Sequence, residues 1–164
     1  MENINILPQI FFLRCYKKFN FPVCIIRFYQ VYGPQQKNDR FIPQLINACK
    51  NGQTFYTSSG SQFRDFIYVD DAITGILKCI ISKKSKGEIF NIGYGKPIQL
   101  KKVMKIVEKK MGNFFPIYGK MKLIKNENLT LYPDISKAKK ILKWKNKISF
   151  VKGIDRTIKY YKNV

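Results

Sequence analysis

Apolar positions along the chain alternate between helical and extended spacing. Residues 4–19 carry apolar side chains at helical spacing, and Pro8 falls where a first helical turn tolerates it. Residues 23–29 (VCIIRFY) form an apolar run that only Arg27 interrupts, and Gly33-Pro34 follows soon after. A run of this kind is typical of a strand buried on both faces of a parallel sheet. The chain is therefore expected to begin with a helix followed by a buried strand.

The same pattern continues to the carboxyl end. Further helices are expected over residues 41–49, 72–81, 100–111, 136–142 and 151–161. Further strands are expected over residues 54–57, 66–69 and 88–92. Asp70-Asp71 is expected to cap the helix at 72–81, and Asp134 or Ser136 the helix at 136–142. Because strands alternate with helices, without a repeat or a linker, the pattern predicts one unit of the α/β or α+β class.

The charge balance is strongly basic. The 164 residues include 31 Lys plus Arg against 10 Asp plus Glu, which gives a net charge of +21. Such a surface attracts nucleic acid, anionic lipid or phosphorylated small molecules. However, the lysines are spread through the chain and only five basic residues are Arg, the residue preferred for reading bases and phosphates. We therefore expect a solvated lysine surface and no specific nucleic-acid binding.

The cysteine and hydropathy patterns indicate the cellular compartment and whether metal or membrane binding is expected. The cysteines are Cys15, Cys24, Cys49 and Cys79, with no CxxC pair and no histidine, so no metal site is expected. They are interpreted as buried thiols in a reducing compartment. No apolar stretch approaches the ~20 residues of a membrane span, and the amino end lacks the order of a signal peptide. A cytoplasmic protein with no membrane partner is expected.

Residues 60–71 (GSQFRDFIYVDD) hold the most informative candidate side chain. Arg64 follows a Gly/Ser turn and leads directly into a strand, where its guanidinium could be aimed at a diphosphate lying across the sheet edge. Alternatively, Arg64 pairs with Asp65 or Asp71 and simply holds the turn. The spacing alone leaves both interpretations open.

Four segments together resemble a known family. They are 27–34 (RFYQVYGP), 64–71 (RDFIYVDD), 88–95 (EIFNIGYG) and 134–144 (DISKAKKILKW). In this order and at these intervals they resemble the carboxy-terminal half of the NAD(P)-dependent nucleotide-sugar epimerases and 4,6-dehydratases, which are extended short-chain dehydrogenase/reductase proteins. Four motifs in register are far more specific than any single short motif.

The resemblance implies an α/β fold that is the carboxy-terminal portion of a Rossmann-type protein. It would contain the last parallel strand or strands and a small mixed α/β substrate-binding lobe. Residues 1–34 would be a remnant of the dinucleotide-binding domain, and residues 35–164 the substrate-binding lobe, packed as one unit.

The resemblance also implies substrate-binding residues. Arg64 matches the family's diphosphate-binding Arg, and Gln30 stands where the family usually has an Asn that touches the sugar diphosphate. Phe41 begins a segment similar to the one that closes over the nucleotide. A second family Arg falls at Ile124, and the adjacent Lys125 could supply its charge but not its planar fork. Gln30 as a loop amide and Phe41 as a core residue are the alternatives.

The residues that carry the family's chemistry are missing. The sequence contains no Gly-rich dinucleotide turn, and its one YxxxK, Tyr118 to Lys122, lies in a strand or loop context where the chemistry needs a helix. No catalytic residue is therefore assigned. NAD(P) is implied for the complete family enzyme, and none is expected to be held by this chain alone.

The predicted function is thus the substrate-binding part of a nucleotide-sugar epimerase or 4,6-dehydratase, inactive alone. Its expected partners are a nucleotide-diphosphate sugar, a separate amino-terminal Rossmann half, and further copies of the chain associating through the helix at 4–19. The alternative is a non-catalytic module that binds nucleotide sugars or RNA.

Overall fold

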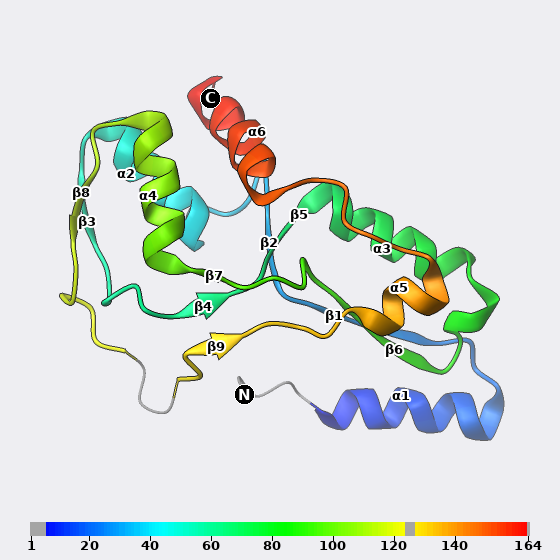
Figure 1. Cartoon of the computed structure of the whole chain (residues 1–164). Helices are drawn as coiled ribbons and strands as arrows, with labels where there is room; N and C mark the ends of the chain where they lie inside the picture. The colour runs from blue at the N-terminus through cyan, green and yellow to red at the C-terminus, as the bar shows by residue number, and fades with distance from the viewer. Residues whose placement is uncertain (1–5, 124–126, 164) are drawn as a thin grey trace.

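The computed structural model describes residues 6–123 and 127–163 (Figure 1). One part is built on β1 (Cys24–Phe28) and β6 (Glu88–Ile92), which pair in parallel over their full length. Helix α1 (Ile6–Phe19) lies on one side of this pair and α3 (Val69–Ile81) on the other (Figure 1). Strand β1 was predicted to be buried on both faces, but none of its residues is buried and Phe28 is 42% exposed, because the helices cover it only in part.

The second part is assembled from shorter strands and three helices. Its helices are α2 (Phe41–Asn51), α4 (Leu100–Met111) and α6 (Phe150–Asn163). Parallel pairs join β2 (Gln30–Tyr32) to β5 (Phe66–Tyr68) and β3 (Thr54–Tyr56) to β8 (Phe115–Ile117). Strand β4 (Phe63–Arg64) lies between β7 (Ile98–Gln99), which is antiparallel to it, and β9 (Thr130–Leu131), which is parallel. A 3₁₀ turn, η1 (Lys83–Ser85), and α5 (Ser136–Leu142) complete the described elements.

Two apolar clusters hold these parts together. One lies under α2, α4 and α6, where Tyr32 is buried and its hydroxyl donates to the Phe150 carbonyl at 3.0 Å. The other joins α3, α5 and β6 around Phe90, Ile92 and Trp144. The α/β class with parallel strand pairs, predicted from the sequence, is confirmed. The division at residue 34 stays a prediction, and β1 pairs with β6 across it.

Two contacts fix α1 against β1 and β6. The Gln9 side chain accepts two hydrogen bonds from Arg27, from Nε at 3.0 Å and from Nη2 at 2.7 Å. At the other end of the helix, the Tyr16 ring packs on Gly87, which adopts a φ of +73° and leaves no room for a Cβ. No residue of α1 is buried, so its outer face carries exposed apolar side chains.

The expected cap of α3 is wrong. The helix begins at Val69, and its N-cap residue, Tyr68, makes no side-chain capping bond. Asp71 is instead buried, and its carboxylate accepts the backbone N–H groups of Lys147 and Ile148 at about 3 Å. The local sequence pattern assigned the Asp71 carboxylate to the N-terminus of α3. The carboxylate instead binds backbone N–H groups that are distant in the sequence. At α5 the N-cap residue is Ile135, not Asp134 or Ser136, and it makes no side-chain capping bond, although Asp134 just before it accepts the Ser136 N–H at 2.8 Å.

All four cysteines are free thiols. Cys49 and Cys79 are buried, whereas Cys15 and Cys24 are only partly covered. Burial raises the pKa of Cys49 to about 11, with a smaller contribution from the Glu108 charge, and burial raises the pKa of Cys79 to about 12. No described residues form a cluster that could hold a metal ion, and no described helix is long and apolar enough to cross a membrane.

The Cys49 thiol predicts an alkaline loss of stability. Its proton is held in the folded state up to about pH 11 but leaves the unfolded chain near pH 9, so unfolding releases a proton between these values. This contribution is fully present below pH 9 and is lost as pH rises, by up to about 1.4 kcal/mol per pH unit. Urea unfolding of wild type and Cys49→Ala from pH 8 to 11 checks this. Parallel pH profiles for the two proteins would contradict it.

Candidate functional site

A cavity of about 380 Å³ lies where α1, β1, β2, β4 and β9 meet the start of α2, and we call it the arginine cavity. The polar side chains among its lining residues are Gln9, Arg27, Tyr29, Gln30, Arg40, Arg64 and Asp65. Three of the chain's five arginines thus line one cavity. Arginine is scarce in this lysine-rich chain, so its concentration here is a local feature that the overall composition does not produce.

Arg64 lies on β4 and is held by its own strand and by the residues that lead into β9. Its Nη1 donates to the carbonyls of Phe63 at 2.9 Å and Leu129 at 3.3 Å, while Nη2 forms an ion pair with Glu127. The Arg64 side chain is only 11% exposed. Neither Asp65 nor Asp71, the two partners considered from the sequence, pairs with it among the described contacts. Glu127 was missed because nothing local in the sequence connects it to a residue 63 positions earlier.

Asp65 organises the turn that follows β6. Its buried carboxylate accepts the N–H groups of Tyr94 and Gly95, both at 2.6 Å. Burial raises the pKa of this carboxyl, and the backbone N–H groups of Tyr94, Gly95 and Lys96 oppose that rise. In the same turn, Gly93 lies so close to Asp65 and Pro133 that a Cβ would clash with both.

This turn does not fit a dinucleotide phosphate. A Gly-rich turn binds a pyrophosphate through free backbone N–H groups, but here those of Tyr94 and Gly95 are directed at Asp65. Within residues 6–123 and 127–163 we find no other glycine-rich strand-to-helix turn that could serve. The turn after β6 is therefore not a Gly-rich phosphate cradle of the Rossmann kind.

The other predicted substrate residues have separate locations. Gln30 opens β2, lines the arginine cavity with Arg64, and donates its N–H to the Asp65 carbonyl at 3.0 Å. Phe41 does not line it: its ring packs on Phe55 and Phe66 at 6.2 Å between centroids, against the core under α2. Lys125 lies outside the described residues.

Arg27 and Arg40 are cavity residues that sequence reasoning did not single out. Arg27 is the one charge in an otherwise apolar strand, which was a usable signal for a functional side chain. Arg40 is exposed and directly precedes Phe41, the residue that begins the segment expected to close over the nucleotide. Arg40, and not Phe41, lines the cavity. Within the described ranges, neither arginine forms an ion pair.

The YxxxK sequence does not form a catalytic pair. Tyr118 lies in a turn after β8, and the Lys101 Nζ sits 5.1 Å from the centre of its ring. Lys122 is in the following loop, so the two side chains do not share the face of a helix.

The fold defines the class of protein. The parallel β1–β6 pair with helices on both faces, joined to a small mixed lobe, is the carboxy-terminal half of an extended short-chain dehydrogenase/reductase fold. An epimerase structure from Methanothermobacter thermautotrophicus superposes with a TM-score of 0.89 at 23% identity, over 96% of this chain and 48% of that protein.

Comparison of sequences gives the family. The sequence model of the NAD dependent epimerase/dehydratase family matches residues 12–93, which is half of the chain, and the protein belongs to this family. UDP-glucuronate 4-epimerase of Thermodesulfobacterium geofontis is 34% identical over 151 residues, 85% of this chain and 43% of that relative. dTDP-D-glucose 4,6-dehydratase of Mus musculus is 29% identical over 153 residues, 90% of this chain and 43% of that protein.

A ligand-bound structure of a relative is also similar. UDP-glucuronic acid 4-epimerase from Bacillus cereus, in complex with UDP-glucuronic acid and NAD, superposes with a TM-score of 0.82 at 29% identity. The match covers 90% of this chain and 48% of that structure. The chain therefore spans about half the length of the relatives it matches.

Proposed function

We propose that this chain supplies the nucleotide-sugar-binding part of an NAD(P)-dependent nucleotide-sugar epimerase or 4,6-dehydratase. The observation that carries the proposal is the arginine cavity, which gathers Arg27, Arg40 and Arg64 beside Gln30. The similarity to nucleotide-sugar enzymes supports it from an independent direction.

The cavity has the chemistry that a sugar diphosphate requires. A diphosphate carries two negative charges spread over several oxygens, and planar guanidinium groups bind such oxygens two at a time. Arg64 and Arg27 are oriented by existing hydrogen bonds, which lowers the entropy cost of binding. Arg40 is exposed at the start of α2 and free to swing onto a bound anion. Gln30 adds an amide that both donates and accepts.

In this proposal the chain alone turns over no substrate. The family resemblance implies a helical Tyr/Lys pair and a Gly-rich turn for the dinucleotide, and among the described residues we find no such pair and no such turn. We propose that an amino-terminal Rossmann half supplies both and extends the sheet at β1, which among the described strands pairs only with β6. Adding such a half from a relative should restore activity, whereas turnover of a nucleotide sugar by this polypeptide alone would contradict the proposal.

Arg64→Lys is the sharpest test of the binding site. A lysine keeps the charge but loses the fork, so affinity for a nucleotide sugar should fall by about 10- to 100-fold, equivalent to ~1.5–3 kcal/mol. Folding should be little changed, because a lysine can still pair with Glu127. Calorimetric titration with UDP-, dTDP-, GDP- and CDP-sugars, together with thermal unfolding, measures both quantities.

Arg156→Lys is the matched control. Arg156 forms an exposed pair with Asp70, away from the arginine cavity, and its replacement should leave the affinity unchanged. If Arg64→Lys lowers stability as much as affinity, Arg64 is a structural clamp. If the wild-type chain binds none of the four classes of nucleotide sugar, the proposed function itself fails.

A further inference from the structure

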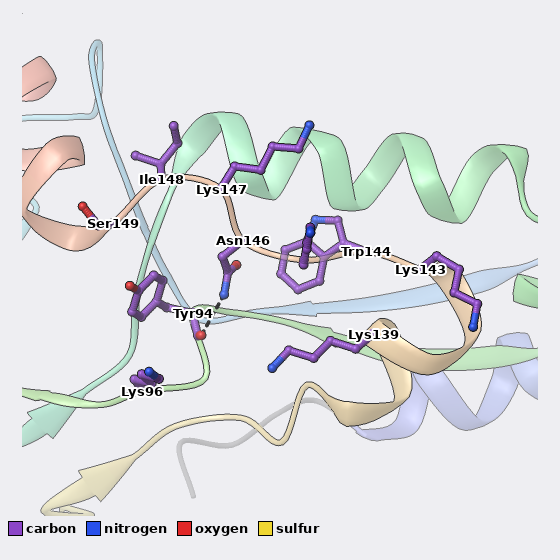
Figure 2. A pocket seen from close by; sticks show the side chains of 10 residues that line it. Tyr94, Lys96, Lys139, Lys143, Trp144, Asn146, Lys147, Ile148 and Ser149 are labelled. Carbon is purple, nitrogen blue, oxygen red and sulfur yellow. Dashed lines mark hydrogen bonds between the residues drawn. The ribbon is translucent and has the colours of Figure 1, made fainter.

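A second, larger hollow lies away from the arginine cavity and shares no lining residue with it. It is a groove of about 730 Å³ between the turn after β6 and the segment that joins α5 to α6 (Figure 2). Half of its lining residues are exposed lysines: Lys96, Lys139, Lys143, Lys145 and Lys147. No carboxylate lines it. We call it the lysine groove.

The segment that carries three of these lysines is firmly anchored. Trp144 is 2% exposed, and its indole N–H donates to the Asp71 carbonyl and to Thr74 Oγ1, both at 3.2 Å. Asn146 Nδ2 donates to the Tyr94 carbonyl at 2.7 Å, as Figure 2 shows. The backbone N–H groups of the next two residues are held by the buried Asp71 carboxylate.

These anchors give the segment an alternating pattern. Trp144, Asn146 and Ile148 contact the protein, whereas the lysines between them are exposed. Lys143, Lys145 and Lys147 occupy alternate positions along the segment, and Lys143 has the left-handed conformation that ends α5 (φ 52°), so the three charges are spread out and not aligned in an extended row. Figure 2 shows Lys139 extending from α5 toward the turn that carries Tyr94 and Lys96.

Asp134 lies near enough to Lys139 to interact with its charge, so an acid offsets part of the positive charge of the groove. None of its five lysines forms an ion pair in the described part of the chain, whereas Lys110 pairs with Asp155 and Lys137 with Glu88. Asp71 lies behind the segment with its carboxylate oxygens occupied by backbone N–H groups. Several exposed ammonium groups without ion-pair partners on a rigid support retain an attraction for anions.

We propose that the lysine groove binds a chain of phosphates, as found in inorganic polyphosphate and in the backbone of single-stranded nucleic acid. Its charges are distributed along the groove and do not converge on one point, which suits several phosphates better than one. Trp144 is buried and hydrogen-bonded, so it offers no face for base stacking, and the contacts are made to phosphate. In this proposal nucleotide sugars bind in the arginine cavity and not in the lysine groove.

The test uses the full chain and two charge-matched triple variants. A fluorescent oligo(dT) is titrated at several KCl concentrations, and unlabelled inorganic polyphosphate serves as competitor. Lys143→Gln/Lys145→Gln/Lys147→Gln removes three groove charges. Lys83→Gln/Lys84→Gln/Lys86→Gln removes three exposed lysine charges around η1, outside the groove, and equalises the change in net charge.

The groove variant should bind about tenfold more weakly at low salt, and the slope of log K against log salt should fall by about 2, or ~0.7 for each lost phosphate contact. The η1 variant should stay within about twofold of wild type. Equal losses in the two variants, or no binding by wild type at low salt, would overturn the proposal.

The competitor separates the two sources of phosphate. If polyphosphate displaces oligo(dT), the groove recognises the phosphate chain whichever molecule carries it, as proposed. If polyphosphate binds and oligo(dT) does not, the ligand is the inorganic chain alone, and the proposal still holds. If oligo(dT) binds and polyphosphate cannot displace it, recognition involves the bases and the proposal is wrong.

Discussion

Asp71→Ala is expected to lower the free energy of unfolding by about 3–5 kcal/mol, because the change removes a buried carboxylate and leaves the part-buried N–H groups of Lys147 and Ile148 without their acceptor. That is a large part of the ~5–15 kcal/mol by which a domain of this size is usually stable. The loss should also release the segment between α5 and α6. Equilibrium unfolding in urea at neutral pH gives the value directly.

Asp70→Ala is the control for this measurement. It removes the same charge from the neighbouring residue, but Asp70 is 56% exposed and, among the described residues, forms an ion pair only with the exposed Arg156 at 3.2 Å. Such a pair contributes at most about 1 kcal/mol. Asp71→Asn should give an intermediate loss, since an amide retains one acceptor oxygen. Equal stabilities for the Asp70→Ala and Asp71→Ala proteins would show that the bonds to the distant segment contribute nothing.

Individual helices and strands were predictable where neighbouring residues in the sequence mark their ends. Strand β6 was expected at residues 88–92 and lies there, because Gly87 and Gly93 delimit a short apolar run. Helix α4 likewise runs over the expected residues and ends at Gly112. By contrast, β4, β7 and β9 have two residues each, too short for a period-2 pattern to be visible in the sequence.

Only those residues of the candidate site that belong to a sequence motif were predictable. Arg64 and Gln30 belong to segments that resemble the family, and both line the arginine cavity. Arg40 lines the same cavity because of the path that the chain takes before α2. Glu127, which pairs with Arg64, is 63 residues away from it in the sequence. Contacts at such separation depend on the whole topology, so local propensity cannot reveal them. Asp71 shows the same effect, since its partners lie 76 and 77 residues later.

The exposed face of α1 leads to the second large expected effect, which is self-association. Leu7 is 76% exposed and Phe11 62%, and the two lie one turn apart on the same face of the helix. A contiguous apolar surface of this kind is typical of an interaction site. The chain should therefore sediment as a dimer or larger species at micromolar concentration.

Salt distinguishes this association from one caused by the net charge of +21. Bridging of the basic chain by a contaminating polyanion weakens steeply as salt rises, because charges are screened over about 3 Å at 1 M. Apolar pairing through α1 persists in 1 M KCl. Sedimentation velocity in both low and high salt therefore reports which of the two forces holds the copies together.

Leu7→Glu/Phe11→Glu should convert the protein to a monomer without loss of stability, because both side chains are largely exposed in the single chain. Ile80→Glu/Ile81→Glu, which changes two residues that are more than 70% exposed on α3, controls for the removal of exposed apolar groups in general. It should leave the association intact. If the α3 variant alone dissociates the complex, the contact lies on the opposite side of the β1–β6 pair. A sharp wild-type boundary at the chain mass of 19.3 kDa at every salt concentration would refute association through α1.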